Sequence, residues 1–267
     1  MKIVTLIENL VFSPGLVAEN GLSLLIDTGH RQILFDTGQT DAFMTNAQKL
    51  GVDLAEVDTV VISHGLYDHI GGLGPFLEMN KKARVYLKKE TFVPKYSQQQ
   101  EKLSGSFDPG SMEDRFVFVT STLEIDPGVF IMPNIPIVNK EDTDFRKCRI
   151  KAGDLLVEDT FEDELFLAIV KDQKLSVISS CSHRGITNMI IEATKHFDEL
   201  PVNLVLGGIN IREGSSLQYV EVSHFLKKVA PETIGVCHCY SIEKYADLLY
   251  DVNSKVKYNH TGNTIEL

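Results

Sequence analysis

Short apolar runs typical of strands alternate along this chain with segments whose apolar residues recur at helical spacing. Alternation with a period of two, or an apolar run bounded by turn residues, predicts a strand, whereas an apolar stripe every three or four residues predicts a helix. The predicted strands are 1–10, 22–27, 32–36, 57–62, 83–87, 165–170, 175–179, 202–206 and 233–236. The predicted helices are 41–50, a short helix after Gly72, 186–197, 216–229 and 242–250.

Both halves of the chain repeat the order strand, loop, helix. Two sets of strands, each followed by helices, predict an α/β fold arranged as a four-layer αββα sandwich. A length of 267 residues with 43% hydrophobic content fits a single domain, residues 1–267. Between about 90 and 159 the pattern weakens into polar, turn-rich sequence. We expect an irregular insert there, either a lid or binding loop near the active site or a partly ordered surface excursion.

Composition and charge narrow the classes of partner. The formal net charge of −11 and the pI near 5.2 oppose attraction to nucleic acid and to anionic membranes. We expect a small-molecule substrate, for which a local basic pocket could still accept an anion. The first ten residues lack the pattern of a signal peptide, and no run reaches the roughly 18 apolar residues that span a bilayer. We therefore expect a cytoplasmic protein, whose oligomeric state the sequence does not reveal.

Three potential metal ligands crowd the loop that follows the buried strand 57–62. His64, Asp68 and His69 occupy six positions, a density typical of a metal centre held by a short, rigid loop. His183 and His238 also come directly after predicted strands. Five donors at matching strand ends predict a common metal site. We assign no ligand role to the remaining histidines, which are His30, His196, His224 and His260.

The ligand loop resembles the signature His-x-His-x-Asp-His of the metallo-β-lactamase superfamily, with Leu66 in place of the second histidine. The chain is most similar to the branch that includes dihydropterin ribofuranosyl-aminobenzene phosphate synthase-like proteins. Asn210 replaces the histidine of that branch's Gly-Gly-Phe-His motif. The resemblance implies the αββα fold and a two-metal centre that lacks two imidazoles. The other segments that carry the resemblance are 34–38, 180–183, 206–208 and 237–239.

The resemblance also implies how the ligands divide between two metal positions. One position would keep only His64 and His183, because Leu66 cannot donate. The other would take Asp68, His69 and His238, all present, and three protein donors with a fourth place open are typical of catalytic zinc. We therefore expect one well-occupied divalent metal, with zinc as the first choice and manganese or iron as alternatives. A second metal is expected to bind weakly or not at all.

Two further residues are expected to support the metal ligands. In proteins of this fold the carboxylate at the position of Asp36 commonly supports the ligand loop, and a carboxylate that accepts an imidazole N–H fixes the tautomer. The alternative for Asp36 is a turn residue that caps the following helix. Asn210 offers only a weak amide donor to a metal, but it could hydrogen-bond a bound water.

Four residues near the candidate ligands could contact a substrate. Arg184 follows His183, and Arg212 lies two positions after Asn210, so either could bind a carboxylate or phosphate. Both could equally be solvated residues at helix starts. Tyr67 and Tyr240 could stack against an aromatic, pterin-like substrate or could simply pack in the core.

The four cysteines are expected to be reduced thiols. Four cysteines in 267 residues do not make a disulfide scaffold. Those that flank candidate ligands are interpreted as small buried hydrophobic residues, with metal ligation or redox chemistry as the alternative. They are Cys181, Cys237 and Cys239.

The expected activity is hydrolysis of an ester or phosphoester by a water that the metal activates, with Asp68 orienting the water and accepting its proton. Because Leu66 and Asn210 replace expected histidines, we expect a slower or altered enzyme. One alternative is a non-hydrolytic transferase or synthase like the pterin-pathway relatives. Another is a degenerate member that binds a ligand without catalysis.

Overall fold

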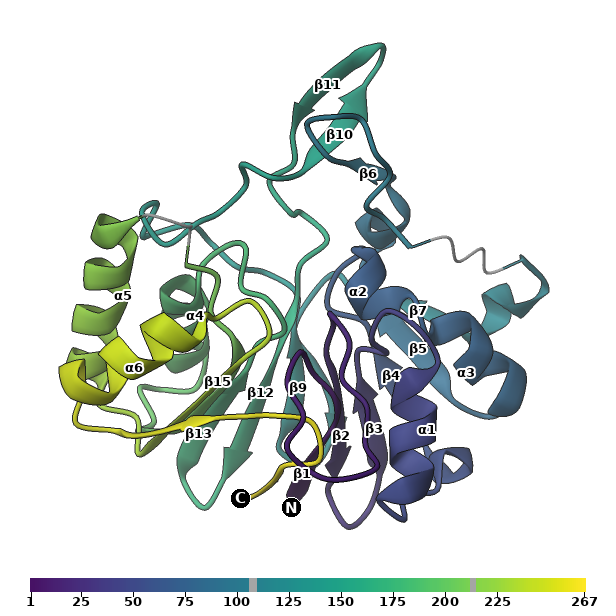
Figure 1. The fold of residues 1–267 in the computed structure, drawn as a ribbon, viewed down its shortest axis with the longest axis horizontal. Coiled ribbons are helices and arrows are strands. Elements are labelled where there is room, and N and C mark those ends of the chain that lie inside the picture. The colour runs from purple at the N-terminus through teal and green to yellow at the C-terminus, as the bar shows by residue number, and fades with distance from the viewer. Residues whose placement is uncertain (106–109, 212–214) are drawn as a thin grey trace. The chain divides into compact units, whose positions relative to one another are not determined.

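Figure 1 shows the computed structural model of the chain, which describes residues 1–105, 110–211 and 215–267. These residues form two compact units, and each is described separately. The first unit comprises Met1–Val119, Arg146–Asp163 and His260–Leu267, and the second comprises Thr120–Phe145 and Glu164–Asn259. One domain over the whole chain stays the prediction from the sequence.

A seven-stranded mixed sheet forms the centre of the first unit, in the order β17-β1-β2-β3-β4-β5-β7. Strands β17, β1, β2 and β3 pair antiparallel, whereas β3, β4, β5 and β7 run parallel. The carboxyl ends of β3 and β4 therefore meet at one edge, which is where open α/β sheets bind ligands. The bounds are β1 Lys2–Ile7, β2 Ser23–Asp27, β3 Gln32–Phe35, β4 Thr59–Val61, β5 Arg84–Leu87, β7 Phe116–Phe118 and β17 Thr264–Glu266.

Two helices of the first unit pack on one face of this sheet (Figure 1). Phe43 of α1 and Phe76 of α3 join Leu34 and Val60 of the sheet in one fully buried cluster. Their burial follows from the helical spacing of the apolar residues in the sequence. The helical elements are α1 Ala42–Lys49, α2 Tyr67–Ile70, α3 Leu73–Met79, and the 3₁₀ turns η1 Leu54–Glu56, η2 Lys89–Phe92 and η3 Gly110–Arg115.

In 90–159, which lacks a clear sequence pattern, the described residues contribute six short strands. A small antiparallel sheet of order β11-β10-β6 belongs to the first unit, and β7 extends that unit's large sheet. Strands β8 and β9 belong to the second unit. Each of the six has two to four residues, too few for alternation to be recognised. The bounds not yet given are β6 Lys95–Tyr96, β8 Leu123–Asp126, β9 Val129–Met132, β10 Arg149–Ala152 and β11 Leu155–Glu158.

The second unit is built on another seven-stranded sheet, of order β16-β15-β14-β13-β12-β9-β8. Strands β13, β14, β15 and β16 are parallel, so their carboxyl ends share an edge, while β12, β9 and β8 add antiparallel pairs. The strands predicted at 165–170 and 175–179 are confirmed as β12 and β13, which pair antiparallel as a hairpin. The bounds are β12 Phe166–Lys171, β13 Lys174–Ile178, β14 Val202–Gly208, β15 Thr233–Cys237 and β16 Lys255–Tyr258.

The helices of the second unit, α4 Ile186–His196, α5 Ser216–Val229 and α6 Ile242–Asp251, confirm the three long helices predicted from the sequence. They pack on the sheet in one apolar cluster, to which α4 contributes Met189, α5 Leu226 and α6 Leu248 (Figure 1). Within the part of the chain that the structure describes, none of the helices is both long and apolar enough to cross a bilayer.

Candidate metal centre

Asp36 lies directly after β3 and faces the residues that follow the parallel neighbour β4. Its backbone N–H donates to the carbonyl of Val61 at 2.9 Å, and its Oδ1 accepts the backbone N–H of Ser63 at 2.7 Å. The side chain is fully buried. The sequence proposed Asp36 as a support for the ligand loop, and its contacts with Ser63 lie at the start of that loop.

One chain of hydrogen bonds joins Asp36 to both histidines of the loop. Oδ2 of Asp36 lies 2.8 Å from Nδ1 of His69 and accepts the hydroxyl of Ser63 at 2.7 Å. Oγ of Ser63 lies 2.7 Å from Nδ1 of His64. A carboxylate accepts only, so His69 donates from Nδ1; because Ser63 gives its proton to Asp36, His64 donates from Nδ1 to Ser63. Nε2 is then the basic nitrogen of both rings, the atom that a metal would bind.

Asp68 and His69 sit in α2, the short helix that begins after Leu66. Oδ2 of Asp68 lies 3.8 Å from Nε2 of His69. Two ligands of one cation at about 2.0–2.2 Å each can be no more than about 4.4 Å apart, so this spacing permits a shared ion. Nδ2 of Asn20 donates to the same Oδ2 at 3.3 Å. Asn20 and Ser63 could not be assigned from the sequence, because Asn20 binds Asp68, 48 positions away, and Ser63 binds Asp36, 27 positions away.

The first unit gathers side chains that could hold a divalent cation. Ligand atoms of Asp36, His64 and His69 all lie within 4.8 Å of one another, and all three side chains are buried. Because Ser63 and Nδ1 of His69 already occupy the Asp36 carboxylate, we assign Asp36 a supporting role and no ligand role. The ring centroids of His64 and His69 are 4.3 Å apart. Imidazoles with Nδ1 engaged and Nε2 basic, beside the carboxylate of Asp68, form a set of nitrogen and oxygen donors that suits zinc or a similar metal.

In the second unit His183 follows β13 and is 7% exposed. Nδ1 of His183 lies 3.1 Å from the side-chain amide of Asn210 and 3.4 Å from the carbonyl oxygen of Asp144. The carbonyl oxygen of Asp144 can only accept, so Nδ1 of His183 carries the proton. If the side-chain amide of Asn210 is rotated by 180°, its oxygen also accepts a hydrogen bond from this N–H. Asn210 therefore contacts a candidate ligand, consistent with the supporting role expected for it.

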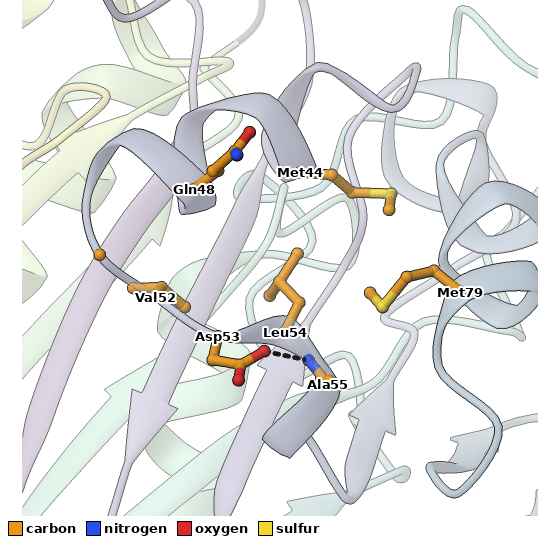
Figure 2. A pocket seen from close by; sticks show the side chains of 8 residues that line it. Met44, Gln48, Val52, Asp53, Leu54, Ala55 and Met79 are labelled. Carbon is orange, nitrogen blue, oxygen red and sulfur yellow. Dashed lines mark hydrogen bonds between the residues drawn. The ribbon is translucent and has the colours of Figure 1, made fainter.

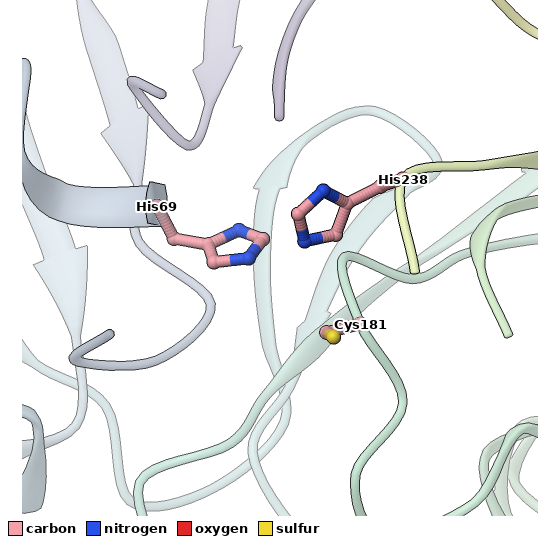
Figure 3. Close-up of side chains that lie close together, drawn as sticks. All are labelled: His69, Cys181 and His238. Atoms are coloured by element: carbon pink, nitrogen blue, oxygen red, sulfur yellow. The ribbon is translucent and has the colours of Figure 1, made fainter. Parts of the chain in front are cut away.

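His238 follows β15 and lies close to Cys181 within the second unit. A ring nitrogen of His238 and Sγ of Cys181 are within 4.8 Å of each other, and both side chains are buried. Figure 3 shows these two side chains together with His69 of the first unit. Sγ of Cys239 donates to the carbonyl of Cys181 at 3.2 Å. None of the four cysteines, all of which the structure describes, is part of a disulfide.

Three residues of the candidate centre adopt left-handed backbone conformations. The φ angle is 59° at Asp36, 54° at Ser182 and 57° at His238. Residues with a Cβ populate this region rarely, at a cost of order 1–3 kcal/mol each, and such positions cluster at functional sites. The surrounding structure must hold these backbones in place.

The candidate substrate-binding residues occupy different environments. Tyr67 is 37% exposed, with its hydroxyl 3.5 Å from Asn20, whereas Tyr240 is 2% exposed in the apolar core of the second unit. Burial raises the pKa of Tyr240 well above its ordinary value. The guanidinium Nε of Arg184 donates to the carbonyl of Ile135 at 3.1 Å. Arg212 lies outside the described residues.

Two cavities lie within the separate units, away from these histidines. One of about 370 Å³ is lined in the first unit by α1, η1 and Met79 (Figure 2). Its carboxylate, Asp53, accepts the backbone N–H of Ala55 at 2.9 Å and caps η1. The other, of about 520 Å³, lies between α4 and α5 of the second unit. Neither lining includes a histidine or a cysteine.

Known proteins resemble the chain over its full length. It is 27% identical to the 7,8-dihydropterin-6-methyl-4-(β-D-ribofuranosyl)-aminobenzene-5′-phosphate synthase of Methanocaldococcus jannaschii, covering 100% of this chain and 96% of that protein. The crystal structure of Tm1679, described as a metal-dependent hydrolase of the β-lactamase superfamily, matches with a TM-score of 0.87 and 28% identity over 100% of this chain and 99% of the other.

A third relative supports the fold alone. The metallo-β-lactamase fold protein YhfI from Bacillus subtilis matches with a TM-score of 0.59 and 13% identity, over 99% of this chain and 98% of the other. The predicted α/β, metallo-β-lactamase-like fold is thus confirmed.

The likeness to the synthase corrects one expectation from the sequence. Hydrolysis of an ester or phosphoester was the expected activity, and that interpretation is wrong: the synthase, matched from end to end, favours the non-hydrolytic alternative. Spacing of metal ligands could not reveal this, because the same ligand loop serves different reactions in one fold. Family and relative together indicate an enzyme with residues that could hold a metal. Residues 16–151 match the family described as the metallo-beta-lactamase superfamily, and the chain belongs to that superfamily.

Proposed function

We propose that this protein is a metal-dependent synthase that joins two small molecules, one of them a reduced pterin. The observation that carries the proposal is the end-to-end likeness to the Methanocaldococcus jannaschii synthase. That relative's name describes a product in which a dihydropterin, through its 6-methyl carbon, is linked to an aminobenzene bearing a ribofuranosyl phosphate. We propose substrates of the same class here, an activated dihydropterin and an anionic aryl ribofuranosyl phosphate.

The proposed metal ligands are those expected from the sequence. Asp68, His69 and His238 would hold one divalent cation, zinc as the first choice, and His64 with His183 a weaker second. Asp68, His69 and His64 belong to the first unit and the other two to the second. That the two sets share ions is an inference from the sequence. The hydrogen-bond chain from Asp36 supports only the ligand role of His64 and His69, because it leaves Nε2 of both rings basic.

A bound divalent cation would supply a Lewis acid that stabilises the charge developing on the departing oxygen of the activated pterin. The protein's own residues would do the rest. The aryl nitrogen attacks the pterin methylene carbon as the carbon–oxygen bond to the leaving group breaks, and the leaving group keeps the electron pair. The amine then loses a proton, for which we propose the carboxylate of Asp68 as acceptor. Asn20, which donates to that carboxylate, would hold it in position.

The test is a coupling assay with metal analysis. Purified protein is incubated with a dihydropterin that carries a phosphate-ester leaving group on its 6-methyl carbon and with the aminobenzene ribofuranosyl phosphate. Mass spectrometry should detect the coupled product in the wild type and at least a hundredfold less in His69→Ala. The control is Tyr250→Phe, because Tyr250 is an exposed residue of α6. This variant should form as much coupled product as the wild type. Release of the leaving group without coupling, or protein without bound metal, would contradict the proposal.

A further inference from the structure

We propose that Asp163 and Glu164 are positioning residues that fix the backbones presenting His64 and His183. This inference rests on the proposed metal-dependent function, in which those histidines are ligands. The two carboxylates are neighbours in sequence, and both are 1% exposed. Each one binds main-chain N–H groups at or next to a candidate ligand, within its own unit.

Asp163 holds the turn that follows His64. Its Oδ2 accepts the backbone N–H of Gly65 at 2.7 Å, and its Oδ1 accepts Nζ of Lys95 at 2.9 Å. Charge-assisted bonds between buried groups are shorter and stronger than neutral ones. Because the peptide of Gly65 begins at the carbonyl of His64, its position limits the directions that the His64 side chain can take.

A buried cluster keeps Asp163 in place. Nζ of Lys95 also pairs with Asp159 and lies 4.6 Å from the ring centroid of Phe161. The other side of that cluster reaches the metal ligand, because the ring of Phe161 lies 5.9 Å from that of His64. Burial lowers the pKa of Lys95, but the two carboxylates outweigh it and hold the pKa above its ordinary value. The ammonium is therefore charged and anchors Asp163.

Residue 65 is itself confined. A Cβ on Gly65 would lie 2.2 Å from the carbonyl oxygen of Thr91, which is closer than any real contact. The same Cβ would lie 3.4 Å from Oδ2 of Asp163, so the backbone of Thr91 and the carboxylate of Asp163 both pack against residue 65. This close packing restricts the position of the peptide, as metal ligands need when they are held before the ion arrives.

Glu164 performs the equivalent task in the second unit. Its Oε1 accepts the backbone N–H of His183 at 2.7 Å and its Oε2 that of Arg184, also at 2.7 Å. Two consecutive N–H groups bound to one carboxylate fix the orientation of the peptide between them. A third buried carboxylate, Asp142, accepts the N–H of Thr187 at the start of α4, which belongs to neither His183 nor Arg184. It provides a matched control.

The conservative variants Asp163→Asn and Glu164→Gln test the inference, with Asp159→Asn and Asp142→Asn as controls. Like Asp163→Asn, Asp159→Asn removes one negative charge that pairs with Lys95, but it keeps the hydrogen bond between Asp163 and Gly65. The first readout is imidazole NMR of the metal-free protein labelled with ¹⁵N-histidine. Asp163→Asn should shift the His64 ring signals and Glu164→Gln those of His183, each leaving the other histidine unmoved. Asp142→Asn should move neither, and Asp159→Asn, which touches His64 only through Phe161 and Lys95, should shift the His64 signals less than Asp163→Asn does. This readout does not depend on bound metal.

The second readout is a zinc titration that resolves a tight and a weak equivalent. Loss of a group that orients a ligand typically weakens metal binding 10–100-fold. We expect at least a tenfold rise in Kd for the weak equivalent in both variants, with the tight one within threefold. Asp163→Asn added to His64→Ala should have no further effect on that Kd, since coupled residues are not additive.

Several results would overturn the inference. The two carboxylates would serve only the fold if the His64 and His183 signals did not move, or if the controls shifted them as far. The same conclusion would follow for Asp163 if the effects of Asp163→Asn and His64→Ala on the Kd of the weak equivalent were fully additive. If the wild-type protein bound the tight equivalent of zinc but no weak equivalent, the metal-binding part of the inference would be wrong. A wild type that takes up no zinc at all would instead refute the proposed function, while the NMR result for the two carboxylates would still stand.

Discussion

Oδ2 of Asp36 accepts a hydrogen bond from Nδ1 of His69 at 2.8 Å, between two side chains that have no exposed surface. The same oxygen accepts the hydroxyl of Ser63, which in turn binds His64. One carboxylate therefore sets the tautomer of two imidazoles. A defect in Asp36 should for this reason affect both histidines at once, although Asp36 is not a proposed ligand.

Asp36→Asn should weaken zinc binding about 10–100-fold. The Asp36 carboxylate accepts hydrogen bonds from Ser63 and His69 through both of its oxygens. The amide of asparagine has an NH₂ group in place of one oxygen, so at least one of these donors loses its acceptor. An unsatisfied buried donor should also lower the free energy of unfolding by about 1–3 kcal/mol. Zinc titration and urea denaturation measure the two effects. Asp41→Asn is the control, because Asp41 is exposed and makes no side-chain cap for α1; equal losses in both variants would contradict the role of Asp36.

Leu66→His should raise the metal content toward two ions per chain. Leu66 stands between His64 and Asp68, where the family's loop carries its second histidine, so an imidazole there supplies the missing donor. Elemental analysis after dialysis against zinc gives the stoichiometry. Leu66→Phe adds a ring without a donor and should stay at the wild-type value. An unchanged metal content in Leu66→His would show that position 66 does not face the metal.

Lys95 should make the stability of the protein depend on pH at the alkaline end. Its folded pKa is raised above 10.5 by Asp163 and Asp159, against the opposing effect of burial. The stabilisation is complete below pH 10.5, and is lost as the pH rises from there through the folded pKa. Lys95→Met should cost about 3–5 kcal/mol at pH 8, because the buried carboxylates lose their partner. That cost should shrink above pH 10.5.

Urea denaturation between pH 8 and pH 12 measures this dependence. Lys82→Met serves as the control, since Lys82 pairs with Glu56 at 3.1 Å but is 49% exposed. Its substitution should change the free energy of unfolding by less than about 1 kcal/mol at every pH. A constant difference between wild type and Lys95→Met across the range would contradict the charge state assigned to Lys95.

Asn20→Ala should lower kcat/KM of the proposed coupling reaction about three- to tenfold, which corresponds to the loss of one hydrogen bond to Asp68. Because the contact to Asp68 is only partly buried, the free energy of unfolding should fall by less than about 1 kcal/mol. Steady-state kinetics and urea denaturation provide the comparison. Asn134→Ala, at an exposed asparagine of the second unit, should leave both quantities unchanged. If both variants behave alike, Asn20 does not support Asp68.

Much of the fold and part of the candidate site could be predicted from the sequence. The helices α4, α5 and α6 and the strands β12 and β13 carry a clear local period. His64, Asp68 and His69 stood out because they follow a buried strand at short spacing. Asp36 could be assigned because the family resemblance points to it. In each case the information lies within a few neighbouring residues, or in a motif.

The missed residues act over long separations. Asp163 binds a peptide 98 positions away, and Asn20 binds a carboxylate 48 positions away. Glu164, just before β12, binds the backbone N–H of His183, which lies 19 positions later in the chain. Nothing in the local pattern marks a polar residue whose partner is distant, and such a residue looks like part of a loop. The short strands of residues 90–159 were missed for a related reason, since pairing with distant neighbours defines them more than their own alternation.

The left-handed backbone at His238 sets stability and activity against each other. Glycine would relieve the strain at this position while deleting the imidazole that the proposed chemistry needs. A library of variants selected for heat tolerance alone should therefore accumulate glycine at position 238 and lose metal uptake. Natural relatives that have lost the reaction should also carry glycine at this position more often than relatives that retain it.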